Sequence, residues 1–257
     1  MTQNTSSKTG LVLSGGAARG IAHIGVLQAL EEADIEIHHV AGTSMGAIVG
    51  AFFAAGIPPK GMLEILKNDR RITERFRLKL PTGGGLLNMH FLAEILDEYI
   101  GVDSIEALKK PLTIAASNLN SGECEFFRKG SLLKAVAASA AIPVLFAPQV
   151  VDGKTYVDGG LTNNLPVDGL PKDCDRIIGV HVNYQEDLGE LDGVWAIAGR
   201  CFSMAIYHTV RDDREKCHLL IEPPETKEFG LFAFHEAEEL YRTGYEAAQK
   251  ELEKFLG

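Results

Sequence analysis

The chain has 257 residues, 46% of them hydrophobic, and a formal net charge of −10. This size supports one large core, so we expect a single α/β domain over residues 10–257 after a flexible N-terminal tail, residues 1–9. The acidic balance disfavours a nucleic-acid-binding surface and provides no general attraction to anionic membranes.

Hydrophobic patterning predicts strands and helices that alternate along the chain. The predicted strands are residues 11–13, 40–41, 112–117, 123–127, 155–157, 176–182 and 218–221. The predicted helices are residues 21–33, 47–55, 132–141, 194–214 and 235–255. Strands that alternate with helices favour a mostly parallel central sheet with both faces covered. The expected fold is therefore a three-layer α/β/α domain.

The turn after the first predicted strand is rich in small residues. It reads SGGAARG and contains Gly15, Gly16, Ala17, Arg19 and Gly20. Such a turn leaves backbone N–H groups accessible, and these can bind a phosphate or the oxyanion of a tetrahedral intermediate. Arg19 would hold the loop in shape or add positive potential. A dinucleotide-binding turn is disfavoured because Ala17 stands where GxGxxG requires its second glycine.

A second turn between a predicted strand and a predicted helix carries a GxSxG motif, from Gly42 through Ser44 to Gly46. The two glycines allow the strand and the helix to approach closely around a sharp turn that exposes the serine hydroxyl. The helix N-terminus favours the negative charge that develops during acyl transfer. A glycine-rich turn without chemistry can share this pattern, but its strand–turn–helix context favours Ser44 as a nucleophile.

A serine nucleophile needs a base, and the sequence offers two kinds. Asp158 follows a predicted strand and precedes Gly159 and Gly160, so we expect it at a strand end, where open α/β sheets place their chemistry. By itself, Asp-Gly-Gly is also an ordinary turn. A Ser-Asp-His triad would instead use a histidine after Asp158, and the candidates are His181, His208, His218 and His235. None of the four lies in a glycine-rich loop after a strand, which favours structural roles.

Together these motifs resemble the patatin-like phospholipase family, in its bacterial-type form with a single patatin domain. LSGGAARGIAHIGVL at 13–27 is similar to the family's oxyanion loop and following helix, 42–46 to its nucleophile elbow, and DGGLTNNLP at 158–166 to its catalytic Asp-Gly-Gly motif. SNLNSGE at 117–123 and ASAAIPVLFAP at 138–148 are similar to two further blocks. The five blocks occur in the family's order, whereas the C-terminal third of the chain matches weakly.

The resemblance implies a Ser44–Asp158 dyad without histidine, an acyl-enzyme intermediate, and an oxyanion bound by the N–H groups around Gly16 and Ala17. It implies hydrolysis of fatty-acyl esters of lysophospholipids, phospholipids or related lipids. Ala17 replaces the usual third glycine of the loop, and Asn118 replaces a frequent aspartate.

Three alternatives stay open at this point. An α/β-hydrolase esterase with a Ser-Asp-His triad is disfavoured because Ser44 follows only two predicted strands, whereas that fold places its elbow well into the sheet. A non-catalytic lipid-binding or regulatory protein on the same fold is disfavoured because both candidate catalytic groups are present. Acyl transfer to an acceptor other than water is compatible with the same residues.

Residues 67–79, from Lys67 to Lys79, contain six basic and two acidic residues, a local net charge of +4. We hypothesise a mobile lid whose basic side contacts phosphate headgroups while Leu86, Leu87 and Phe91 contact acyl chains. This would give peripheral, transient membrane contact. The competing interpretation is a solvated charged helix followed by a flexible turn.

The remaining sequence features indicate an intracellular protein without a prosthetic group. The N-terminus lacks the apolar core of a signal peptide, and no stretch is typical of a membrane span. The cysteines show no CxxC or zinc-type spacing, which is typical of reduced, structural thiols in the cytoplasm: Cys124, Cys174, Cys201 and Cys217. We expect no metal and no organic cofactor.

Overall fold

The computed structural model describes residues 7–69, 71–72, 89–184 and 193–257. Within these ranges the strands form one eight-stranded sheet of order β5-β6-β3-β2-β1-β7-β8, with β4 paired to β3. Their bounds are β1 Thr9–Leu13, β2 His39–Thr43, β3 Leu112–Asn118, β4 Cys124–Phe127, β5 Gln149–Val151, β6 Lys154–Asp158, β7 Arg176–Val180 and β8 Leu219–Ile221. Strands β3, β2, β1, β7 and β8 are parallel, whereas β4, β5 and β6 are antiparallel to their neighbours. The sheet is therefore mixed and mostly parallel.

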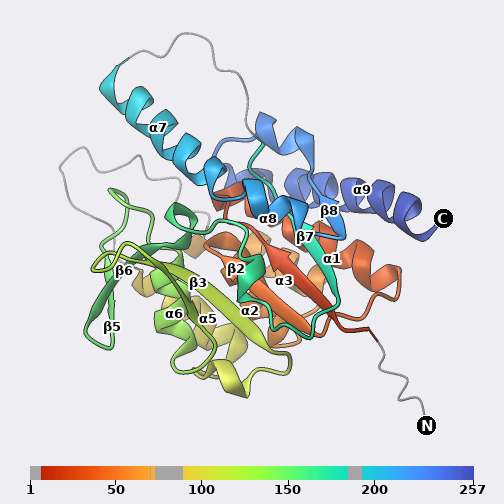
Figure 1. Cartoon of the computed structure of the whole chain (residues 1–257), viewed down its shortest axis with the longest axis horizontal. Coiled ribbons are helices and arrows are strands. Elements are labelled where there is room, and N and C mark those ends of the chain that lie inside the picture. The colour runs from red at the N-terminus through yellow and green to blue at the C-terminus, as the bar shows by residue number, and fades with distance from the viewer. Residues whose placement is uncertain (1–6, 70, 73–88, 185–192) are drawn as a thin grey trace.

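Helices cover the sheet and extend beyond it (Figure 1). Their bounds are α1 Ala22–Glu32, α2 Met45–Ala54, α3 Pro59–Asn68, α5 His90–Ile100, α6 Leu132–Ser139, α7 Val194–His208, α8 Arg211–Glu215 and α9 Ala237–Leu256. The larger core lies between one face of the sheet and α1, α2, α6 and α9, and it continues outward to α3 and α5. A smaller core around Val12, Leu165 and Val210 covers the other face. The fold is thus α/β with helices on both faces of the sheet, as predicted. None of the helices in the described ranges is both long and apolar enough to cross a bilayer.

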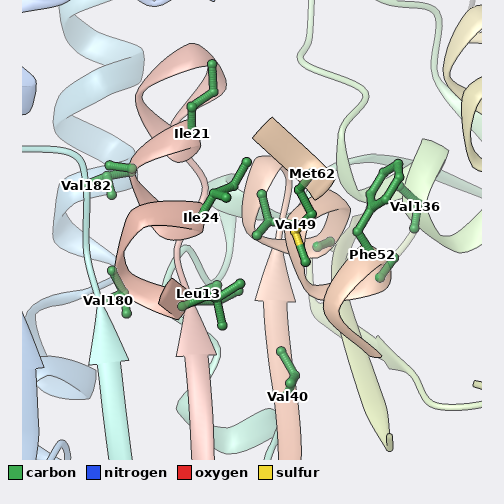
Figure 2. Packing of buried hydrophobic residues seen from close by; sticks show 14 of the residues in the cluster. Leu13, Ile21, Ile24, Val40, Val49, Phe52, Met62, Val136, Val180 and Val182 are labelled. Atoms are coloured by element: carbon green, nitrogen blue, oxygen red, sulfur yellow. The ribbon is translucent and has the colours of Figure 1, made fainter. Parts of the chain in front are cut away.

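The larger core is continuous from the sheet to the outer helices. Figure 2 shows Leu13 of β1 below Ile24 of α1, and Val49 and Phe52 of α2 beside Met62 of α3. All five side chains are at most 7% exposed. Apolar side chains of β1 and the small and apolar residues of α2 form this part of the core. The outer helix α3 therefore packs directly on α2, the helix that begins after Ser44.

The C-terminal helix α9 is fixed against α1 by backbone contact. A Cβ atom added at Gly25 of α1 would lie 1.9 Å from the Tyr241 carbonyl oxygen, and one at Gly244 of α9 would lie 1.9 Å from the Ala22 carbonyl oxygen. Two glycines on facing helices therefore allow this close crossing. The crossing also fixes the end of the loop that leads into α9.

The predicted strands and helices all occur, with two differences in detail. The predicted helix 194–214 is divided into α7 and α8 at Thr209–Val210. Helices α3 and α5 and strand β5 were not predicted. Their signals are present: α5 buries Phe91, Leu92, Ile95 and Leu96 at helical spacing, and the turn between β5 and β6 uses Asp152 and Gly153 at positive φ, the Asp-Gly signature of a tight hairpin. Of the predicted tail, residues 1–6 lie outside the described ranges.

Candidate active site

Ser44 lies in the turn between β2 and α2 with strained backbone angles. Its φ is 52° and its ψ is −120°, a conformation that side chains other than glycine adopt rarely. Such strain costs on the order of 1–3 kcal/mol and persists only where surrounding structure imposes it. The turn directs the Ser44 hydroxyl to Asp158, and Oγ donates a hydrogen bond to Oδ2 at 2.5 Å.

The two glycines of the elbow are required by close backbone contacts. A Cβ at Gly42 would lie 2.5 Å from the Gly46 carbonyl oxygen, and a Cβ at Gly46 would lie 2.2 Å from the Leu13 carbonyl oxygen. A side chain at either position would therefore separate α2 from β2 or from β1. The GxSxG pattern thus brings the elbow against the end of β1, where the small-residue turn begins.

Asp158 is the last residue of β6, and it is only 4% exposed. Besides the Ser44 hydroxyl, the N–H of Gly160 donates to its carboxylate, to Oδ1 at 2.8 Å. Burial raises the pKa of Asp158 from 3.8 to about 6, although the hydrogen bonds from Ser44 and Gly160 lower it. The carboxylate is thus a stronger base than an exposed aspartate.

Asp158 lies at a strand end, and the register of that strand places it near Ser44. Strand β6 runs antiparallel to β3, and the register pairs Asp158 with Ala116. Strand β3 runs parallel to β2 and pairs Ala115 with Thr43. Asp158 therefore reaches Ser44 across the end of β3, because β6 lies beside β3 in the sheet and β2 lies on the other side of β3.

Ser139 connects the main chain of the elbow to β3, although sequence reasoning assigned it no role. It is fully buried at the end of α6. Its Oγ accepts the N–H of Ser44 at 2.8 Å and donates to the carbonyl of Ala115 at 2.6 Å. The Ala-Ser pair within residues 138–148 was the signal that could have identified it. Ser117 similarly donates to the main-chain oxygen of Asp158 at 2.8 Å.

The small-residue turn presents two backbone N–H groups near Ser44. The N–H of Gly15 is occupied by the main-chain and side-chain oxygens of Asn164, both at 3.2 Å. Across the described part of the chain, the N–H groups of Gly16 and Ala17 have no hydrogen-bond acceptor. Ala17 has a φ of 48°, the left-handed conformation that glycine favours. Alanine therefore adopts the glycine conformation of this loop at some cost in strain.

Arg19 holds the turn to a distant segment. Its Nε donates to the Phe229 carbonyl at 2.9 Å and its Nη2 to the Lys227 carbonyl at 3.2 Å. On the other side of the turn, a Cβ at Gly20 would meet the side chain of Met45. Of the two predicted roles for Arg19, the contacts support the one of holding the loop in shape.

An apolar cavity opens beside Ser44, with an empty volume of about 890 Å³ including its mouth. Its lining comes from α2, α3, α5, the segment after α6 and the segment before α9. The lining residues are Ala17, Ile24, Ser44, Met45, Ile48, Val49, Phe52, Met62, Ile65, Leu66, Ile72, Met89, Phe91, Leu92, Ile95, Ala140, Ile142, Phe146, Phe232 and Phe234. Among these described residues, Ser44 has the only polar side chain. The arrangement provides a reactive hydroxyl at an otherwise hydrocarbon-like surface.

Comparison with known proteins identifies the family. The sequence profile of the family described as "Patatin-like phospholipase" matches residues 11–171. The chain belongs to the patatin-like phospholipase family. It is similar to an uncharacterised NTE family protein of Mycobacterium tuberculosis (strain H37Rv), 36% identical over 188 residues that cover 71% of this chain and 51% of that protein. It is also similar to the lysophospholipase nte1 of Aspergillus fumigatus, 29% identical over 282 residues that cover 95% of this chain and 18% of that protein. The chain thus spans about half or less of these relatives.

Solved structures show the same patatin-like fold. VipD from Legionella pneumophila gives a TM-score of 0.55 at 17% identity and covers 97% of this chain and 67% of that chain. Full-length ExoU of Pseudomonas aeruginosa, solved with SpcU, gives a TM-score of 0.53 at 16% identity over 97% of this chain and 53% of that chain. At these identities the likeness concerns the fold.

Three of the four histidines considered for a triad make other contacts in the described part of the chain. His181 is 2% exposed, and its Nδ1 pairs with Glu222 Oε1 at 2.8 Å. His218 accepts the N–H of Ile177, His208 ends α7, and His235 is mostly exposed. Within the described ranges no histidine forms a hydrogen bond with Ser44 or Asp158.

The basic segment predicted as a lid is described only in part. Lys67 pairs with Glu64 and Glu238, and Arg71 pairs with Asp69 and Glu98. Arg70 and residues 73–88, which include Leu86 and Leu87, lie outside the described ranges. Phe91 lines the cavity, and its contact to an acyl chain stays a prediction.

Proposed function

We propose that this chain is a serine acyl-hydrolase that cleaves fatty-acyl esters of lysophospholipids, phospholipids or related lipids through Ser44 and Asp158. The observation that carries the proposal is the 2.5 Å hydrogen bond from Ser44 Oγ to Asp158 Oδ2 at an apolar cavity. A hydroxyl paired with a buried carboxylate is a nucleophile with its base in place. The apolar lining favours an acyl chain over a polar substituent.

In the acylation step, Ser44 Oγ attacks the ester carbonyl while its proton passes to Asp158 Oδ2. The N–H groups of Gly16 and Ala17 bind the oxyanion of the tetrahedral intermediate, and the N-terminus of α2 adds a favourable dipole. Gly15 and Arg19 position this turn through Asn164 and the carbonyls of Phe229 and Lys227. The intermediate collapses, the carbon–oxygen bond to the alcohol breaks, and Asp158 returns the proton to the departing alcohol.

In the deacylation step, Asp158 accepts a proton from a water molecule that attacks the acyl-enzyme. The second tetrahedral intermediate uses the same two N–H groups. Its collapse breaks the bond between Ser44 Oγ and the acyl carbon, releases the fatty acid and returns the proton to Ser44. Two protons, each accepted and then released by one carboxylate, thus complete the cycle without histidine.

The pKa of Asp158 sets the pH dependence. Because the base must be ionised, and burial raises its pKa to about 6, kcat/KM should rise about tenfold per pH unit below pH 6 and level off above it. A pH–rate profile for a soluble ester checks this. If the residual activity of Asp158→Asn rises with pH around the same midpoint, the pKa of that transition does not belong to Asp158.

The relatives and the charge pattern extend the proposal. A lysophospholipase is among the similar proteins, which supports a lipid ester as substrate. The basic residues within 67–79 would contact phosphate headgroups during transient association with a lipid surface. We treat residues 10–257 as one functional domain, since one sheet connects β1 to β8.

The test is hydrolysis of a p-nitrophenyl acyl ester series by the wild type, Ser44→Ala and Asp158→Ala, with circular dichroism as the fold check. We expect Ser44→Ala to lose at least about 10³-fold and Asp158→Ala about 10²–10⁴-fold in kcat. His181→Gln, which leaves the dyad intact, is the matched control for the triad alternative. Full activity in Asp158→Ala, or its loss in folded His181→Gln, would overturn the dyad. A wild type inert on every ester would favour lipid binding without catalysis.

A further inference from the structure

The segment that precedes α9 connects the oxyanion turn to the cavity. We name residues 227–234 the strap. Its carbonyls accept three hydrogen bonds from the turn: Arg19 Nε to Phe229, Arg19 Nη2 to Lys227, and the N–H of Ala18 to Leu231 at 3.0 Å. The position of the turn therefore depends on the position of the strap.

The strap also forms part of the cavity wall. Phe232 and Phe234 line the cavity together with Ala17 and Ser44. The strap is held at both ends by buried side chains, since Phe229 is 9% and Phe234 is 6% exposed. Between them, Gly230, Leu231 and Phe232 are exposed, and a Cβ at Gly230 would meet nothing within 4 Å. The middle of the strap is thus accessible to solvent at the cavity.

We propose that an acyl chain packed against Phe232 orders the strap and, through it, the oxyanion turn. Phe232 is then a positioning residue that makes kcat, and not only KM, depend on acyl-chain length. This inference rests on the proposed hydrolase function, and it identifies acyl-chain length as the substrate feature that affects kcat. Because Ser44 and Phe232 line the same cavity, we expect a medium-length chain to reach Phe232 and an acetyl group to stop short of it.

The physical basis is the sensitivity of the oxyanion donors to position. Such donors act when they lie about 2.7–3.1 Å from the developing oxyanion, and a displacement near 1 Å can cost about 10²-fold. Ala17, which carries one of the two N–H groups, has a left-handed φ of 48°. That conformation depends on contacts outside the turn, and the strap provides three of them. Filling the cavity stabilises those contacts, so a longer chain should improve transition-state stabilisation.

The first experiment compares kcat for p-nitrophenyl acetate and octanoate in the wild type, Phe232→Leu and Phe146→Leu. Phe146 is the matched control because it lines the same cavity outside the strap. We expect the octanoate-to-acetate ratio of kcat to fall at least about fivefold in Phe232→Leu. In Phe146→Leu, KM for octanoate should rise while that ratio stays near the wild-type value. Equal changes of the ratio in both variants, or a change of KM alone in Phe232→Leu, would overturn the proposal.

Arg19→Met tests the connection itself. It removes two of the three hydrogen bonds to the strap, so it should abolish the chain-length dependence of kcat. The double variant Phe232→Leu/Arg19→Met should then show no further change in the ratio, since both substitutions interrupt one connection. Additive effects of the two substitutions on the ratio would contradict it.

A measurement without turnover separates this inference from the proposed function. Hydrogen exchange of residues 14–20 is followed in Ser44→Ala with and without decanoate, and again in Ser44→Ala/Phe232→Leu. Decanoate should slow exchange in the first protein and not in the second. Equal protection in both proteins would contradict the proposed coupling even if the wild type hydrolyses esters. Selective protection with an inert wild type would instead sustain the coupling and reject the hydrolase.

Discussion

Two regions of this molecule meet at Ser44 and are built in different ways. The elbow and its partners are joined by main-chain contacts: Gly46 touches the Leu13 carbonyl, Ser139 connects the Ser44 N–H to the Ala115 carbonyl, and Gly160 donates to Asp158. The cavity wall is instead made by apolar side chains from helices and loops that are distant in sequence. One region depends on backbone position, the other on volume and hydrophobicity.

The difference teaches which substitutions each region tolerates. A Cβ added at Gly42 or Gly46 would lie 2.5 Å or 2.2 Å from a carbonyl oxygen, so there is no space for it. A buried N–H or C=O that loses its partner is also costly. Apolar walls accept changes of shape when the total volume is kept. We therefore expect the sensitivity to substitution to fall from the elbow to the cavity wall.

The largest effect on stability is expected from Gly46→Ala. Its Cβ would lie 2.2 Å from the Leu13 carbonyl oxygen, so β1 or α2 must move. We expect a loss of more than about 4 kcal/mol in the free energy of unfolding, measured by urea denaturation. Gly50→Ala, on the same helix, is the control, since its Cβ would meet only side chains at 3.2 Å or more. Its effect should stay within about 1 kcal/mol. Similar losses in both variants would contradict the comparison.

Asp158→Asn should lower the activity and, at high pH, raise the free energy of unfolding. Burial raises the folded-state pKa of Asp158 from 3.8 to about 6, so the folded protein binds more protons than the unfolded chain between these pH values. The contribution of Asp158 to the stability of the wild type therefore falls as pH rises from about 4 to about 6, by on the order of 3 kcal/mol. Asn carries no charge to desolvate.

At pH 8 the Asp158→Asn variant should therefore unfold at higher denaturant concentration than the wild type, and this advantage should vanish at pH 4. Its kcat should be about 10²–10⁴-fold lower. Unfolding curves at the two pH values check the stability difference, with pH 4 serving as the internal control. A difference of the same size at both values would show that the carboxylate is not the cause.

Ser139→Ala is expected to have an intermediate effect. It leaves the Ser44 N–H and the Ala115 carbonyl without their buried partner, at a cost of about 1–3 kcal/mol in unfolding free energy. The elbow would also lose its support, so kcat should fall about tenfold while KM changes little. Ser203→Ala on the exposed part of α7 is the control, because its Oγ donates a local hydrogen bond to the Gly199 carbonyl one turn earlier. Unchanged kcat in Ser139→Ala would remove this residue from the supporting contacts.

The smallest effect is expected from Met62→Leu in the cavity wall. Met62 is 3% exposed on α3, and leucine keeps most of its volume. We expect a loss below about 1.5 kcal/mol and a change in kcat/KM of about threefold or less. Thermal unfolding and ester hydrolysis measure both. A loss as large as that of Ser139→Ala would show that the wall is as constrained as the elbow.

Much of the fold could be predicted because its signals are local. The central strands and the helices that bury one face show clear periodicity, and all of them occur close to the predicted positions. Helices α3 and α5 were missed although part of their signal is local, since Met62, Ile65 and Leu66 follow helical spacing. The division of the predicted helix 194–214 at Thr209 depends on contacts to Asn164 and Gly160 that no local pattern contains.

The candidate site shows the same difference between local signals and distant contacts. Ser44, Asp158 and the small-residue turn could be named from sequence because sharp turns demand particular residues at particular spacings. Ser139 and Asn164 received no role of their own, since the sequence does not show which backbone group, 95 or 149 positions away, a small polar residue binds.

The sequence alone determined the turns and the type of residue in each, because steric limits on φ and ψ act within a few residues. Only the tertiary structure decided that β6 runs antiparallel to β3 and so brings Asp158 to Ser44. It also decided that α3, α5 and the strap enclose an apolar cavity against the same turn. These arrangements follow from many weak contacts summed over the whole core, and such sums are not present in any single segment.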